Sequence, residues 1–216
     1  THISLAGKMI AFAGWEMPAW YTSTREEHHA VRETAALFDV AHMGVLEVAG
    51  EQATAFLDAL TTNYVRGMGD GESIYSYLLD ADGEVLDDLM IYRRAQDRYM
   101  LVVNAVNEEK DYAWLEAVLR REVAIDRDYP GKVAPDDVVV RSLKHPAAGE
   151  EQRVDLAIQG PNSLAILQKL AENSGLRERL ARIRRTEFIE AELAGIPLTI
   201  SPVSYTHLTL PTNREV

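Results

Sequence analysis

Two adjacent acids, Asp87 and Asp88, stand inside an apolar run that has the pattern of a β-strand, EVLDDLMIY at residues 84–92. Strand side chains alternate between the two faces of a sheet, so these carboxylates point in opposite directions. A buried carboxylate is costly without a donor, a cation or a ligand. The pattern therefore indicates that at least one acid meets a donor or a cavity. The structural alternative is an acid that accepts backbone hydrogen bonds near a sheet edge.

Other familiar chemistries do not fit the spacing of the remaining polar residues. The acids that follow Asp80 do not make an EF-hand, because the sixth and twelfth positions hold neither the glycine nor the glutamate that the loop needs. The sequence contains no HExxH motif, no GxSxG elbow and no glycine-rich phosphate loop with its lysine. His28 and His29 point apart on a predicted helix, and His42 is interpreted as a half-buried structural residue. No metal site is predicted.

Composition narrows the classes of function further. The chain has 216 residues, 47% of them hydrophobic, and a formal net charge of -12. This acidity argues against general binding to nucleic acid or to an anionic membrane, both of which need clustered Lys and Arg. Cysteine is absent, which excludes disulfides and thiolate nucleophiles. No apolar run reaches the roughly 20 residues of a membrane helix.

The elements that position the two acids follow from periodicity and turn residues. Helices are expected at 23–37, 51–63, 107–122, 163–173 and 176–183. Strands are expected at 38–50, 72–80, 84–92, 98–105, 137–143 and 154–160, with a hairpin at 186–201. Turns at Asp82-Gly83 and Gln96-Asp97 predict antiparallel hairpins. The fold class is therefore α+β, with mixed, largely antiparallel sheets and packed helices.

Several burial predictions accompany these elements. The segment 7–18 is predicted to be a strand or a buried loop, and Ser23 with Glu26 has the form of a capping box. The helix at 23–37 is expected to bury a stripe made of Ala30, Val31, Ala35 and Leu37. The acids at the start of the third helix, Glu108 to Asp111, are interpreted as a solvated, capping face.

Aromatic and methionine side chains concentrate in the first half of the chain. As a set they suit a flat heteroaromatic ligand that stacks near an acid, and individually they are core residues. The members are Phe12, Trp15, Met17, Trp20, Tyr21, Met43, Tyr75 and Tyr77.

Five segments together resemble the aminomethyltransferase, or T protein, of the glycine cleavage system. They are KMIAFAGWEMPAWYTS, EEHHAVRETAALFDVAHMG, IYSYLLDADGEVLDDLMIY, VVNAVNEEKDYAWL and AIQGPNS, and the match extends over roughly residues 5–200. They occur in the order and at the spacing that the family shows. A chain of motifs of this kind is far more specific than any single motif.

The resemblance implies an enzyme that binds tetrahydrofolate and receives an aminomethyl group on the lipoyl arm of a carrier, the H protein. The methylene passes to tetrahydrofolate and ammonia leaves. In the family the second acid of the pair is catalytic, which is Asp88 here. The family's folate pocket also matches at Met43, Tyr75 and Asn104, while Asp87 is assigned a structural role.

Two departures from the family pattern are visible. The connection 129–153 is longer than the family's, so its HPAAGEEQR portion is expected to be a surface loop. After LTIS the family continues with a second half of comparable size, whereas this chain has PVSYTHLTLPTNREV. The sequence is therefore interpreted as an incomplete, C-terminally truncated folate-binding region at 1–200, followed by a non-native tail at 201–216. Part of the folate site is expected to be missing.

Two other functions remain open at this point. Related folate-binding proteins act in iron–sulfur cluster assembly without catalysis, and others are folate domains of sarcosine- or dimethylglycine-oxidising enzymes. The resemblance favours a cytoplasmic protein, or one of the mitochondrial matrix if the source is eukaryotic.

Overall fold

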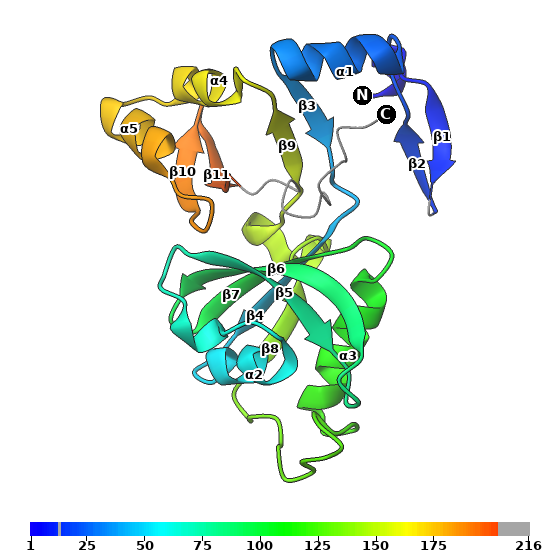
Figure 1. Ribbon diagram of the computed structural model, residues 1–216, viewed down its shortest axis with the longest axis vertical. Helices are drawn as coiled ribbons and strands as arrows, with labels where there is room; N and C mark the ends of the chain where they lie inside the picture. Colours follow the sequence, from blue (N-terminus) through cyan, green and yellow to red (C-terminus); the bar gives the residue numbers. More distant parts are fainter. Residues whose placement is uncertain (13, 203–216) are drawn as a thin grey trace, which may run out of the picture.

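The computed structural model describes residues 1–12 and 14–202, so all but the first two residues of the expected tail at 201–216 lie outside the described residues. An antiparallel five-stranded sheet, in the order β5-β6-β7-β4-β8, forms the lower part of the molecule (Figure 1). Its strands are β4 (Gly44–Ala49), β5 (Ser73–Leu79), β6 (Val85–Ala95), β7 (Arg98–Val103) and β8 (Val139–Ser142). The predicted hairpins at 82–83 and 96–97 are confirmed, because β5 pairs with β6 and β6 with β7.

Two helices cover one face of this sheet. They are α2 (Ala53–Leu60) and α3 (Glu108–Leu119), and the short 3-10 turn η2 (Val65–Gly67) follows α2. Phe56 and Leu57 of α2 and Leu115 of α3 are fully buried against Leu46 and Ile91 of the sheet. Burial of such side chains contributes about 1.5–3 kcal/mol each, so this face holds the main core.

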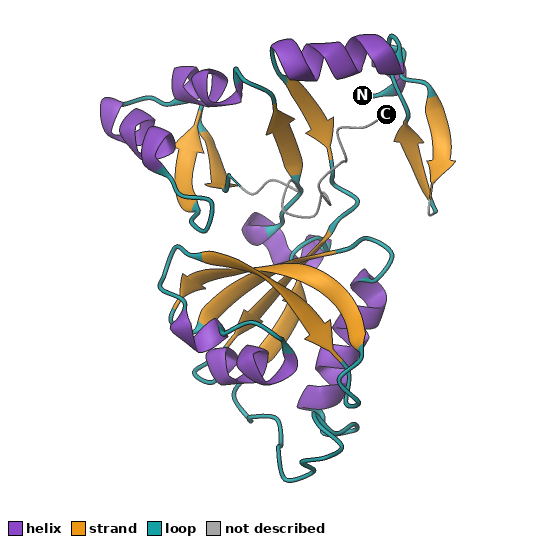
Figure 2. Cartoon of the chain, viewed as in Figure 1, coloured by secondary structure: helices purple, strands orange, loops and turns teal. Residues whose placement is uncertain are grey.

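The remaining elements form an upper layer (Figures 1 and 2). It contains three two-stranded pairs, β1 with β2, β3 with β9, and β10 with β11, together with three α-helices and two 3-10 turns in the described part of the chain. The strands are β1 (Met9–Phe12), β2 (Trp15–Pro18), β3 (Ala36–Asp39), β9 (Leu156–Gln159), β10 (Ile189–Leu193) and β11 (Ile196–Ile200). The helical segments are η1 (Ile3–Leu5), α1 (Thr24–Glu33), η3 (Pro146–Glu151), α4 (Ser163–Leu170) and α5 (Ser174–Arg182). The α+β class with largely antiparallel pairing is confirmed.

The start of α1 agrees with the sequence, whereas its expected buried stripe is wrong. Ser23 Oγ accepts from the Glu26 N–H at 3.2 Å and donates to the Glu26 carboxylate, so Ser23 caps the helix, with its hydroxyl in place of its backbone N–H as the donor to Glu26. No residue of α1 is buried, and Leu37, which lies in β3, is 67% exposed. The amphipathic pattern provides an apolar face, of which Val31 and Ala35 are partly buried and Ala30 is exposed.

The segment 7–18 confirms the strand alternative of the prediction. It forms the β1–β2 hairpin rather than a buried element, and Phe12 is 60% exposed. Trp15 is half exposed and lies under the Lys144 ammonium, 5.1 Å from its ring centroid.

The strand end at Gly160 packs closely against the end of α1. Gly160 has φ +120°, and a Cβ there would meet the carbonyl oxygens of Val31 and Thr34 at 2.6 Å. Only glycine permits both the backbone conformation and this contact. The approach allows the Asn162 N–H to donate to the Thr34 carbonyl at 2.9 Å, which joins α1 to the β9–α4 connection.

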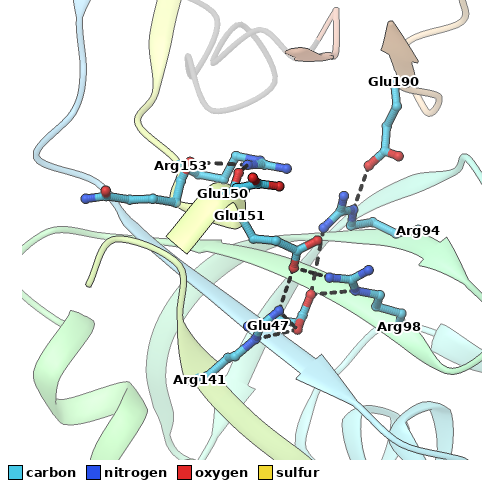
Figure 3. A network of polar contacts seen from close by, with 9 residues as sticks. Glu47, Arg94, Arg98, Arg141, Glu150, Glu151, Arg153 and Glu190 are labelled. Atoms are coloured by element: carbon cyan, nitrogen blue, oxygen red, sulfur yellow. Dashed lines mark hydrogen bonds and ion pairs between the residues drawn. The ribbon is translucent and has the colours of Figure 1, made fainter. Parts of the chain in front are cut away.

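The segment 145–153 lies at the surface as expected, since most of its residues are exposed, but it contains a 3-10 turn and is anchored to the sheet. It forms η3, in which Ala148 is buried and Glu151 pairs with Arg98 and Arg141 of the sheet (Figure 3). The proline and small residues of this segment suggested a loop. Glu151 at the end of η3 instead pairs with Arg98 and Arg141 of the sheet.

Glu47 is the centre of this ion-pair network. Its buried carboxylate accepts from Arg98 Nε at 2.6 Å and from Arg141 Nε at 2.7 Å, and Arg94 lies 3.7 Å away (Figure 3). Arg94 also pairs with Glu190 of β10 at 2.6 Å, so the network connects the upper layer to the sheet.

Candidate functional site

A cavity of about 770 Å³ lies over the sheet face opposite α2 and α3. Residues of β5, β6 and β7 form one wall, including Tyr75, Asp88, Met90, Tyr92 and Met100. Residues of the upper layer form the other wall, namely Gln152 to Leu156, Arg185, Thr186 and Ile196 to Thr199 of β11. The volume lies in the range of sites that enclose a small organic ligand.

The four residues predicted for the folate site all line this one cavity. Asp88 lies on β6 and Tyr75 on the neighbouring strand β5, whereas Asn104 directly follows β7 and Met43 directly precedes β4. They are far apart in sequence, and the antiparallel order of the sheet brings them together.

Strand alternation places the two acids as the sequence predicts. Asp87 is 4% exposed and shares the core face with Leu89 and Ile91. Asp88 faces the cavity with Met90 and Tyr92. One strand therefore supplies the core on one side and the candidate site on the other.

Two neutral donors hold the Asp88 carboxylate. The Tyr75 hydroxyl donates to Oδ2 at 3.2 Å, and Asn104 Nδ2 donates to Oδ1 at 3.0 Å and to the Asp88 carbonyl at 3.1 Å. Each carboxylate oxygen can accept a further hydrogen bond, because it has two lone-pair positions. The arrangement fixes the acid and leaves it able to contact a ligand.

Tyr75 is suited to act as a donor. Burial, followed by its hydrogen bond with Tyr77 and the charge of Asp88, raises the pKa of the Tyr75 phenol. The hydroxyl therefore keeps its proton over the ordinary working range of pH. Its ring also makes an edge contact with Tyr77, with centroids 5.4 Å apart.

Asp111 departs from the predicted solvated face of α3, because it is completely buried. Burial, followed by its hydrogen bond to Asp87, raises the pKa of Asp111 to about 8. The periodicity of the helix placed Asp111 among charged residues. Its true neighbour is an acid on β6, which no local pattern indicates.

The sequence reasoning missed three charged residues of the cavity wall, Asp155, Arg153 and Arg185. Asp155 immediately precedes β9, and its Oδ2 atom is buried with no hydrogen-bond partner in the described part of the chain. Burial raises the pKa of Asp155 to about 6, against the opposing influence of Lys144. The available signal was an acid inside the predicted strand at 154–160, the same pattern that drew attention to Asp88.

The aromatic set contributes less than expected. Met43 and Tyr75 line the cavity, whereas the other six members do not. Trp20 and Tyr21 are each 38% exposed and Tyr77 is 41% exposed. His42 is half-buried, and its carbonyl accepts from Lys144 Nζ at 3.1 Å.

The described residues contain neither a candidate metal site nor a candidate membrane-spanning helix. Within 1–12 and 14–202, no group of three or more His, Cys, Asp or Glu side chains is placed to hold a metal ion. In the same residues, no helix has the length and apolar character needed to cross a membrane.

Fold and site together define an α+β protein with an acid-bearing cavity over an antiparallel sheet. The chain belongs to the family described as the GCVT N-terminal domain, whose model matches residues 1–207.

Individual relatives agree with this family. The chain is 39% identical over 201 residues to an aminomethyltransferase of Halalkalibacterium halodurans, covering 93% of this chain and 48% of the relative. It is 40% identical over 205 residues to an aminomethyltransferase of Chloroherpeton thalassium, covering 95% and 50%. The chain thus spans about half the length of the curated relatives it matches.

A solved structure gives the same result. The glycine cleavage system aminomethyltransferase T from Bartonella henselae is similar to this chain with a TM-score of 0.70 and 32% sequence identity. The similarity covers 88% of this chain and 45% of that structure.

Proposed function

We propose that this chain forms the folate-binding part of an aminomethyltransferase of the glycine cleavage system. In this reaction a methylene group moves from the lipoyl arm of the H protein to tetrahydrofolate. The carbon–sulfur bond to the arm breaks, carbon–nitrogen bonds to folate form, the amino nitrogen leaves as ammonia and the dithiol is released. Because the two aminomethyltransferase relatives described above come from bacteria, we propose a cytoplasmic location.

One observation carries the proposal. Met43, Tyr75, Asp88 and Asn104 match the family's folate pocket in sequence, and in the structure all four line the same cavity. The matched positions come from four separate parts of the chain. Their convergence supports a ligand site more strongly than the motifs alone do.

The residues present fit tetrahydrofolate as a ligand. The cavity combines apolar side chains such as Met90 and Val102 with the amide of Asn104, whose oxygen can accept a hydrogen bond from a heterocycle edge. Asp155 contributes a buried carboxyl oxygen that lacks a partner in the described chain. Arg153 and Arg185 supply positive charge for the carboxylates of the ligand's glutamate tail.

The chain's own residues contribute position and charge. When bound, tetrahydrofolate supplies the nitrogens that accept the methylene. Asp88 is held by Tyr75 and Asn104, so its negative charge is preorganised where positive charge develops during transfer. The apolar wall limits water around that charge, which strengthens the interaction. A group of this kind contributes about a hundredfold or more in rate.

The test uses a chimera, because the chain spans about half of its relatives. Residues 1–200 replace the matching half of the Halalkalibacterium halodurans relative, and ammonia release from aminomethylated H protein is measured with and without tetrahydrofolate. We expect release only with tetrahydrofolate, and a loss of about a hundredfold or more in the Asp88→Asn variant. The relative itself is the positive control, and a cooperative thermal transition verifies that each protein is folded.

Three results would contradict the proposal. A folded chimera that binds tetrahydrofolate but releases no ammonia would indicate a binding module of the iron–sulfur assembly type. A near-normal rate in a folded Asp88→Asn chimera would remove Asp88 from the catalytic role. Activity with sarcosine or dimethylglycine as methylene donor would point to the oxidising enzymes.

A further inference from the structure

Two acids from different elements meet in the core below the cavity. Asp87 on β6 is 4% exposed and Asp111 on α3 is 0% exposed. The two carboxyl groups are close enough for Asp87 to raise the pKa of Asp111. Two charged carboxylates so close would repel each other, and a proton on one of them relieves that repulsion.

The contacts identify Asp111 as the protonated partner. Asp87 Oδ2 accepts from the Asn104 N–H at 2.9 Å, and its Oδ1 accepts from Asn104 Nδ2 at 2.9 Å and Asn107 Nδ2 at 2.6 Å. All three contacts make the Asp87 carboxylate an acceptor. Neither carboxyl oxygen of Asp111 receives a hydrogen bond from a donor in the described chain. As an acid, Asp111 instead donates to Asp87.

Asn104 joins this buried pair to the cavity. Its Nδ2 group donates to Asp87 Oδ1 at 2.9 Å on the core side and to Asp88 Oδ1 at 3.0 Å on the cavity side. Because Asn104 Nδ2 donates to Asp87 Oδ1, a rotation of the Asp87 carboxylate would also turn the Asn104 side-chain amide. That amide is one of the two groups that hold Asp88.

We propose that Asp111 is a positioning residue: by donating its proton to Asp87 it fixes the Asn104 amide and thereby orients Asp88 in the cavity. The importance of Asp88 to a ligand rests on the proposed function. The contacts that link Asp111 to Asp88 are independent of that proposal.

The proposal gives the site a dependence on pH. The pKa of Asp111, raised to about 8 by burial and then by Asp87, is lowered slightly by Lys110 on the same helix. The charged residues of the adjacent strands β4 and β8, Glu47 and Arg141, pair with each other on the opposite sheet face. Above about pH 8, Asp111 therefore becomes an anion against Asp87, and Asn104 loses its fixed partner.

The direct test follows the Asn104 side-chain amide by NMR and needs no ligand. We expect its resonances in the unmodified chain to shift with a midpoint near the pKa of about 8, and to stay in place in Asp111→Asn, whose neutral amide donates to Asp87 at every pH. The Asn173 amide, which caps α5, is the internal control. Asp111→Ser provides a second neutral donor if Asp111→Asn does not fold. A pH-independent Asn104 amide in the unmodified chain, or the same titration in the neutral variants, would overturn the proposal.

A second measurement connects the amide to the ligand. Tetrahydrofolate affinity of the chain is measured on both sides of the Asp111 titration. We expect the unmodified chain to lose about threefold to tenfold in affinity on the alkaline side, the amount one weakened hydrogen-bond network accounts for. Asp111→Asn should lose much less, and ionisation of the ligand cancels in this comparison. An equal loss in both proteins would overturn the link between Asp111 and Asp88. No binding by the unmodified chain at neutral pH would count against the proposed function, while the amide titration would still decide the role of Asp111.

Discussion

The Tyr75 hydroxyl donates to Oδ2 of Asp88 at 3.2 Å across two neighbouring strands of the sheet. Because Tyr75 is opposite Met90 and Asp88 is opposite Tyr77, the bond runs diagonally over the sheet face that lines the cavity. Diagonal neighbours lie about 7–8 Å apart at Cα, a distance that a tyrosine side chain spans. The sheet register therefore sets the geometry of the candidate catalytic acid.

Replacing Tyr75 with phenylalanine should remove this bond and keep the ring. We expect tetrahydrofolate affinity to fall by about twofold to tenfold and the free energy of unfolding by about 0.5–1.5 kcal/mol. Calorimetric titration and urea unfolding measure the two quantities. Tyr64→Phe is the matched control, because Tyr64 is 68% exposed and lies outside the cavity. Equal effects of the two substitutions would show that the bond to Asp88 is unimportant.

Asp155→Asn should stabilise the chain in a manner that depends on pH. The folded-state pKa of Asp155, about 6, exceeds its ordinary value of 3.8, so the native state binds more protons between these values. The stability of the unmodified chain relative to the variant therefore falls as pH rises from 3.8 to about 6, and is constant above that. We expect a gain on the order of 1 kcal/mol at neutral pH from removal of the buried charge. Urea unfolding of both proteins across this range tests the prediction, and a pH-independent difference would contradict it.

Asp111→Asn should also stabilise the chain increasingly as pH rises, over a wider range of pH than Asp155→Asn. Its pKa changes from an ordinary 3.8 to about 8 on folding, so the unmodified chain loses stability relative to the variant throughout that range. The variant should therefore melt a few degrees higher near the alkaline end. Differential scanning calorimetry at several pH values measures this, with Asp126→Asn in an exposed turn as control. A variant that is less stable than the unmodified chain at alkaline pH would contradict the assignment of the proton to Asp111.

Glu47→Gln should be strongly destabilising. Burial alone would raise the pKa of Glu47, but hydrogen bonds from Arg141 and Arg98 outweigh it and the pKa is lowered. Loss of the charge weakens two charge-assisted hydrogen bonds while Glu151 still pairs with both arginines, so we expect a cost of about 1.5–3 kcal/mol. The contribution of Glu47 is present above its ordinary pKa of 4.5 and disappears as pH falls below it through the lowered folded-state value.

Glu190→Gln is the control for this network. Glu190 pairs with Arg94 at 2.6 Å, but its side chain is 49% exposed, so we expect a loss of about 0–1 kcal/mol. Urea unfolding separates the two cases. Similar losses for Glu47→Gln and Glu190→Gln would show that the buried position of Glu47 has no special effect.

Local patterns predicted what depends on local geometry. Alternation along β6 separates Asp87 from Asp88, because successive strand side chains always lie on opposite faces. The capping box at Ser23 and the hairpin turns were predicted for the same reason, since a few neighbouring residues determine them. The positions Met43, Tyr75 and Asn104 came from the family resemblance, because nothing in their own surroundings marks them.

The missed features depend on contacts between distant segments. Asp155 reaches the cavity because β9 pairs with β3, and Arg185 reaches it because the Ser73 N–H donates to the Thr186 carbonyl at 2.8 Å. Asp111 is buried because α3 packs on the strand that carries Asp87. Likewise, the apolar side of α1 shows that a face could be buried but not whether a neighbour exists to cover it.

The pairing of β3 with β9 has a consequence for the order of folding. The whole five-stranded sheet and its two helices lie between these strands in the sequence, from Gly44 to Ser142. Pairing β3 with β9 closes a long loop, and closure of an unstructured loop of that length is slow and entropically costly. A sheet that has already formed holds residues 39 and 156 near each other and removes most of that cost. We therefore expect the sheet to form early, with its hairpins of short sequence separation, and the upper layer to dock afterwards, so that the cavity exists only after the last folding step.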